Sequence, residues 1–113
     1  MKRLVKMRKI STASIVVACC AILPSADAAD ISIDQANKTF SQPSVTVKTG
    51  DRLIFKNGDD VTHNITIEDK DGNGDDKGMQ KPGEEISEKF DAAGEFTARC
   101  QIHPRMKMKI TVQ

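Results

Sequence analysis

The sequence predicts an all-β domain, a small antiparallel β-sandwich or barrel. Between residues 31 and 112, apolar and polar residues alternate over short runs, which is the pattern of strands with one buried face. Turn-forming residues separate these runs, and no segment shows the sustained 3.6-residue apolar repeat of a helix. Seven or so short strands in so small a chain indicate two sheets that pack face to face.

Each predicted strand is defined by apolar residues of one parity and is closed by a turn. Thr49-Gly50-Asp51 ends the second run, Asn57-Gly58-Asp59-Asp60 ends the third, and the segment 91–94 ends the fifth. The runs are marked, in chain order, by Ile31 and Ile33; Val45 and Val47; Leu53 and Phe55; His63, Ile65 and Ile67; Ile86 and Phe90; Phe96, Ala98 and Cys100; and Met106, Met108, Ile110 and Val112.

One long polar segment, Asp69 to Gly83, interrupts the strand pattern. Its composition predicts a surface loop. Asp69, Asp71 and Asn73 match the first half of a calcium-binding EF-hand loop. However, Gln80 occupies the place of the bidentate glutamate, and no flanking helices are predicted, so a solvated loop is the favoured interpretation.

Residues 1–28 have the composition of a secretory signal peptide. Five basic residues precede the apolar run STASIVVACCAIL, and the small-residue site Ala26-Asp27-Ala28 follows. The run is too short and too interrupted by Ser and Thr to be a good membrane-spanning helix. We expect cleavage after Ala28 and export to the periplasm. In the alternative, the sequence before Cys19 resembles a lipobox, and Cys19 would carry a lipid anchor.

The remaining domain, residues 29–113, is small and mildly acidic. Residues 1–28 contribute five basic residues and one acid, so removing their net +4 from the whole-chain charge of +1 leaves −3. This charge argues against nucleic acid as a partner. No further apolar run approaches membrane-spanning length, and we expect a soluble monomer.

Cys100 is the single cysteine of residues 29–113. Small exported domains usually carry an even number of cysteines, paired in disulfides. An unpaired thiol in an oxidising compartment must therefore be buried, reactive, dimer-forming or metal-bound. A small domain without disulfides also gains stability from a metal site.

The candidate metal ligands are His63, Cys100, His103, and either Met106 or Met108. Two histidines and a cysteine with a weak axial methionine are the donor set of blue copper sites. Structural zinc sites prefer cysteine pairs or more histidines and do not use a thioether. The donor types therefore favour copper over zinc.

The segment Cys100-Gln101-Ile102-His103-Pro104-Arg105-Met106 closely resembles the copper loop of the cupredoxins, in its short amicyanin-type form. The upstream segments GDRLIFKN and VTHNI also resemble strands of that family, so the resemblance covers roughly residues 45–112. It implies a Greek-key β-sandwich of about seven to eight strands and one type 1 copper ion. By this resemblance His63, Cys100, His103 and Met106 are the ligands, and Asn64 matches the asparagine that ties the two ligand loops together.

Two methionines compete for the axial position. Met108 would give the longer histidine–methionine spacing of plastocyanin-type loops, but Pro104 directly after His103 fits the shorter loop. We therefore expect Met106 as the axial ligand and Met108 as part of the core. The chain departs from the family at Ala98, two residues before the cysteine, where an aromatic residue is common, and at Phe96, where tyrosine is common. These departures concern the potential and the docking partner.

The resemblance implies an exported blue copper protein that carries one electron between redox partners and is not an enzyme. The partners would dock weakly and transiently near His103, beside Arg105 and Lys107. The alternative is a periplasmic copper-binding or delivery protein with the same ligands and no electron-transfer role. A catalytic or thiol-redox role for Cys100 ranks last, because no second cysteine could resolve a disulfide.

Overall fold

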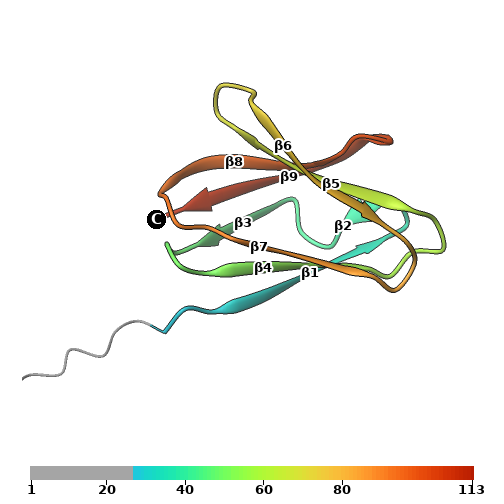
Figure 1. The fold of residues 1–113 in the computed structure, drawn as a ribbon, viewed down its shortest axis with the longest axis horizontal. Coiled ribbons are helices and arrows are strands. Elements are labelled where there is room, and N and C mark those ends of the chain that lie inside the picture. The colour runs from blue at the N-terminus through green and yellow to red at the C-terminus, as the bar shows by residue number, and fades with distance from the viewer. Residues whose placement is uncertain (1–26) are drawn as a thin grey trace, which may run out of the picture.

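The computed structural model describes residues 27–113, which form two β-sheets packed face to face (Figure 1). The strands are β1 (Asp30–Ala36), β2 (Thr39–Phe40), β3 (Ser44–Val47), β4 (Arg52–Asn57), β5 (His63–Asp69), β6 (Gly74–Gln80), β7 (Glu85–Lys89), β8 (Gly94–Cys100) and β9 (His103–Val112). One sheet has the order β2-β1-β4-β7 and the other the order β3-β9-β8-β5-β6. The predicted all-β sandwich is confirmed.

The sheets are mixed, whereas the sequence analysis predicted antiparallel sheets. β1 pairs in parallel with β4, and β3 pairs in parallel with β9, while the other neighbours are antiparallel. Alternation of apolar residues shows which face of a strand is buried, but it does not show the direction of the strand beside it.

Two of the nine strands were not predicted. β2 has only two residues, too few to show alternation. β6 lies within the segment 69–83 that was expected to be a loop, so that expectation is wrong for residues 74–80. β6 is an edge strand, and most of its residues are exposed, which explains its polar composition. The exposed carboxylate of Asp69 accepts hydrogen bonds from the backbone of Asp71 and Asn73, as in an ordinary turn.

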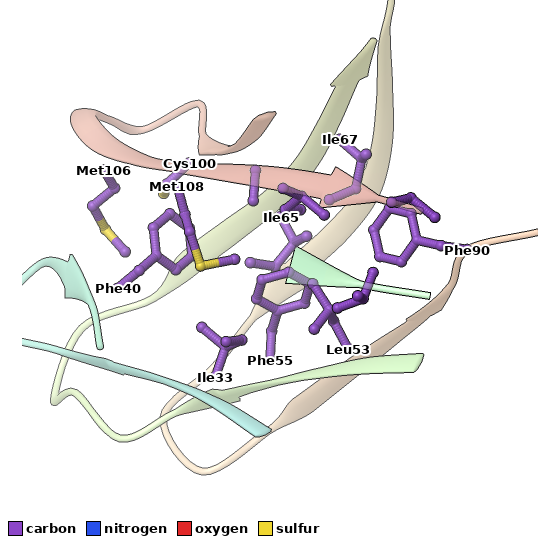
Figure 2. Packing of buried hydrophobic residues seen from close by; sticks show 14 residues of the cluster. Ile33, Phe40, Leu53, Phe55, Ile65, Ile67, Phe90, Cys100, Met106 and Met108 are labelled. Atoms are coloured by element: carbon purple, nitrogen blue, oxygen red, sulfur yellow. The ribbon is translucent and has the colours of Figure 1, made fainter. Parts of the chain in front are cut away.

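The core fills the space between the two sheets (Figure 2). Leu53, Phe55 and Ile65 are fully buried. Met106, Met108, Cys100 and Phe40 lie at one end of the core, and Phe90 lies at the other (Figure 2). One continuous core therefore extends from the candidate metal ligands to the opposite end of the sandwich.

Asp51 ties the first described residues to this core at the end of the sandwich that carries the C-terminus. Its Oδ1 accepts a hydrogen bond from Ala29 N (2.8 Å), and its Oδ2 accepts one from Lys48 N (2.8 Å). The hydrogen bond from Ala29, followed by the one from Lys48, lowers the pKa of Asp51 below the ordinary carboxyl value of 3.8.

The predicted signal sequence lies almost wholly outside the described residues, as do Cys19 and its lipidation. Within residues 27–113, no helix has the length and hydropathy needed to cross a bilayer.

Candidate metal centre

Three strand ends converge at the end of the sandwich opposite the C-terminus (Figure 1). β5 begins at His63, β8 ends at Cys100, and β9 begins at His103. β5 and β8 are neighbours in the same sheet, so tertiary pairing brings His63 beside the C-terminal pair of ligands. His63 and Cys100 are buried, and His103 is partly exposed.

The donor atoms of these three residues lie within 4.8 Å of one another. His63 Nδ1 is 3.2 Å from His103 Nδ1, and Cys100 Sγ is 3.5 Å from His103 Nδ1 and 4.0 Å from His63 Nδ1. Two donors bound at about 2.0–2.3 Å from one shared ion lie roughly 3.3–4.0 Å apart, from tetrahedral to trigonal arrangements, and the three distances run from just below this range to its upper end. The spacing of the two nitrogens and the sulfur therefore fits a metal ion held among them.

Met106 lies beside this donor set because the pairing of β8 with β9 is irregular there. The register runs from Arg99–Lys107 directly to Cys100–His103, which leaves residues 104–106 in a bulge next to Cys100. Met106 is 1% exposed, and Figure 2 shows it at the same end of the core as Cys100. Met108 pairs with Ala98, farther along the strand, and is buried in the core.

Asn64 connects the two ligand segments. Its backbone N donates a hydrogen bond to Cys100 Sγ (3.2 Å), and its side-chain Oδ1 accepts one from Gln101 N (3.2 Å). Its Nδ2 donates to Gly78 O (3.0 Å) and Asp76 Oδ1 (2.8 Å) on β6. Asn64 thus ties the two ligand segments together, as the resemblance implied.

Asp59, which the sequence analysis treated only as a turn residue, contacts the ring of His63. Asp59 Oδ2 lies 3.0 Å from His63 Nε2 and accepts a hydrogen bond from Lys38 N (2.8 Å). The Lys38 amide, followed by the His63 ring, lowers the pKa of Asp59 to about 2. The ionised carboxylate only accepts hydrogen bonds, so Nε2 of His63 carries the proton and Nδ1 is directed at the other donors. The only sequence signal for Asp59 is its place in a turn four residues before His63.

Two buried amides near this end of the core were also not predicted. Gln35 is fully buried, and within residues 27–113 neither its Nε2 nor its Oε1 has a hydrogen-bond partner. Gln80 is also fully buried, but its Nε2 donates to Phe55 O (2.9 Å). Gln35 pairs with Phe40 on β2 and with Asn57 on β4, which places it between these strands.

The exposed side of the centre surrounds His103. Ile102, 47% exposed, is one of two large apolar side chains exposed in the described part of the chain. A shallow depression next to it is lined by Lys38, His103, Pro104 and Arg105, among others. The exposed Ile102 and the two basic residues Lys38 and Arg105 thus lie around the most accessible donor.

Two imidazoles, a thiol and a buried thioether at one end of a β-sandwich define the class of blue copper electron-transfer proteins. The model of the family "Copper binding proteins, plastocyanin/azurin family" matches residues 28–113. The chain belongs to this family, and copper is its cofactor.

Individual relatives agree with the family match. The chain is 30% identical to the chloroplastic plastocyanin of Tetradesmus obliquus over 118 residues, covering 94% of this chain and 81% of the relative. It is 28% identical to amicyanin-alpha of Methylorubrum extorquens over 107 residues, covering 91% and 88%. A reduced Cu(I) form of an amicyanin mutant superposes with a TM-score of 0.68 at 27% identity, covering 74% of this chain and 82% of that chain.

Proposed function

We propose that this protein is an exported carrier of single electrons whose copper ion is held by His63, Cys100, His103 and Met106. The convergence of two imidazole nitrogens and one thiol sulfur within 4.8 Å carries this proposal. Met106 completes the set from the buried side. Neither Met108, which pairs farther along β9, nor a second cysteine is needed.

When bound, copper supplies the reversible exchange of one electron, and the protein residues set its geometry. Cys100 provides a thiolate, and the Asn64 N–H directed at Sγ stabilises charge on that sulfur. His63 is held by Asp59, and Met106 by the core around it. Because strands and packed side chains fix the donors, little rearrangement is needed when the charge of the site changes.

The same arrangement favours a carrier over an enzyme. The four proposed ligands fill the coordination of the ion, and His63, Cys100 and Met106 are buried, so no position is left open for a substrate. His103 is the proposed route for electrons because it is the only one of the four that is partly exposed.

The proposed partners are redox proteins that dock over His103. Ile102 offers an apolar contact, and Lys38 and Arg105, which line the depression, suit an acidic patch on the partner. A small interface of this kind forms weak, short-lived complexes, as repeated electron transfer requires. We further propose that residues 1–28 direct export to the periplasm and that cleavage after Ala28 leaves the copper-binding domain 29–113.

The decisive experiment is to add Cu(II) to the purified protein and record its visible absorption. An intense thiolate-to-copper charge-transfer band is expected. Cys100→Ser should abolish this band, although the variant should still fold in the absence of copper. Absence of the band in the wild-type protein would refute the proposed centre.

A second measurement separates a carrier from a copper-delivery protein. The reduced protein is mixed with a Cu(I) chelator, and loss of copper is followed over time. A carrier retains its copper over many rounds of oxidation and reduction, whereas rapid transfer to the chelator would favour delivery.

A further inference from the structure

We propose that Asp59 is a positioning residue of the metal centre, which fixes the ring of His63 and whose charge favours the oxidised metal. This inference rests on the proposed role of His63 as a copper ligand. Three features of the structure carry it: the contact between the two side chains, the way Asp59 itself is held, and the burial of the contact.

The two nitrogens of the His63 ring face different groups. Nε2 lies 3.0 Å from Asp59 Oδ2, while Nδ1 faces His103 Nδ1 at 3.2 Å and Cys100 Sγ at 4.0 Å. A carboxylate partner leaves the proton on Nε2 and the lone pair on Nδ1. The ring is thus held in the one tautomer that can donate to a metal from the Nδ1 side.

The carboxylate is held from three directions. Asp59 Oδ2 also accepts a hydrogen bond from Lys38 N (2.8 Å), and Oδ1 accepts one from Asp60 N (3.1 Å). Asp59 N donates to Asn57 Oδ1 (2.9 Å) at the end of β4. Lys38 presents its amide from a turn in which both Asn37 (φ 52°) and Lys38 (φ 55°) adopt the left-handed conformation. Asp59 therefore joins the β1–β2 turn to the ligand.

The contact lies away from bulk water. The His63 side chain is 0% exposed and that of Asp59 is 12% exposed. Charges interact more strongly where water does not screen them. A backbone carbonyl in this place would also orient the ring, but it would add no full charge. A carboxylate one ring away stabilises the 2+ ion more than the 1+ ion, so it lowers the reduction potential.

The test is Asp59→Asn, with Asp60→Asn as its matched control. The asparagine Oδ1 can still accept from Lys38 and His63, so the fold is retained and only the weak bond from Asp60 is lost. Asp60→Asn removes the same charge one residue farther along, where no contact with His63 exists. Affinities for Cu(II) and Cu(I) and the reduction potential are measured for each protein.

We expect Asp59→Asn to weaken Cu(II) binding 10–100-fold and Cu(I) binding less, which raises the potential. Asp60→Asn should remain close to wild type. Equal losses for both oxidation states would show that Asp59 only supports the structure. Equal shifts of the reduction potential in the two variants would show that the charge acts through the general electrostatic field and not through the contact with His63. Either result overturns the inference.

A second readout needs no copper. Long-range ¹H–¹⁵N spectra of the copper-free protein report which nitrogen of His63 carries the proton. We expect a fixed Nε2–H in the wild-type protein, in Asp60→Asn and in Asp59→Asn, whose Oδ1 still accepts, and a mixture of tautomers in Asp59→Ala, which has no acceptor. A mixture in the wild-type protein would refute the role of Asp59, whereas a missing charge-transfer band would refute the copper centre.

Discussion

The backbone N–H of Asn64 donates a hydrogen bond to Cys100 Sγ at 3.2 Å, and through its side-chain Oδ1 the same residue accepts one from Gln101 N. One asparagine thus holds both the sulfur and the residue after it. Since Asn64 is 1% exposed, these bonds are made in a buried setting, where an unpaired polar group is costly.

Asn64→Ala should therefore loosen the segment 100–103. The variant keeps the backbone bond to Sγ but leaves Gln101 N and Thr66 Oγ1 without their acceptor. We expect a loss of about 1–3 kcal/mol in the free energy of unfolding of the copper-free protein, measured by urea titration. Gln101→Ala removes only the partly buried bond from Gln101 Nε2 to Thr66 Oγ1 and keeps the Gln101 N–H bond to Asn64, so it serves as the control with a smaller expected loss.

Substitutions of Met106 and Met108 should differ in their effects on the reduction potential and on the stability of the protein. Met106→Leu keeps the volume, retains the colour and raises the reduction potential, because an apolar side chain replaces an electron-pair donor and this destabilises the 2+ ion more than the 1+ ion. Met108→Ala leaves a cavity and should cost about 2–5 kcal/mol with little change in potential. Cyclic voltammetry and thermal unfolding of both variants check this. A larger shift of potential from Met108→Leu than from Met106→Leu would assign the axial position to Met108.

Gln35 should be a site where an apolar residue stabilises the protein. Its buried amide has no partner in residues 27–113, so Gln35→Leu removes a desolvation cost of about 1–3 kcal/mol. An increase of several degrees in the melting temperature is expected. Gln80→Leu is the matched control: it breaks the bond to Phe55 O and should lower the melting temperature. If Gln35→Leu were also destabilising, an ordered water molecule bound to the amide would be the explanation.

Asp51 should make the stability of the domain sensitive to acid. Its folded-state pKa lies below 3.8, the value for an unrestrained carboxyl group, so its contribution is complete above about pH 4 and is lost as the pH falls below that value. At pH 7, Asp51→Asn should unfold at a lower temperature than the wild type. The difference should shrink between pH 4 and pH 2. A constant difference over this range would show that the charge of Asp51 makes no contribution.

The parts of the fold that sequence reasoning predicted are those with one buried and one exposed face. Leu53 and Phe55 in β4, or Met108 and Ile110 in β9, repeat at every second residue because their side chains enter the core. β6 is at an edge and has water on both sides of most of its length, so it has no such pattern. The parallel pairing of β1 with β4 leaves no mark on either sequence.

Some residues of the metal centre could likewise be predicted from the sequence, and others could not. Cys100, His103 and Met106 could be recognised because their donors and spacing are unusual in one short segment, and His63 because the segment VTHNI resembles the family's first histidine ligand. Asp59 could not, since a carboxylate after Asn57-Gly58 is what any turn would contain. Gln35 was missed because its polar side chain interrupts the apolar run, although it shares the parity of Ile31 and Ile33 and is buried with Ile33.

The proposed cleavage after Ala28 would change the chemical nature of the hydrogen bond between Ala29 N and Asp51 Oδ1. Removal of the leader converts this amide nitrogen into an α-ammonium group, 2.8 Å from a carboxylate that already points at it. A hydrogen bond between an amide and a carboxylate would thereby become an ion pair between an ammonium group and a carboxylate. Cleavage of the leader would then stabilise the fold, and the mature domain would have a larger free energy of unfolding than its own precursor.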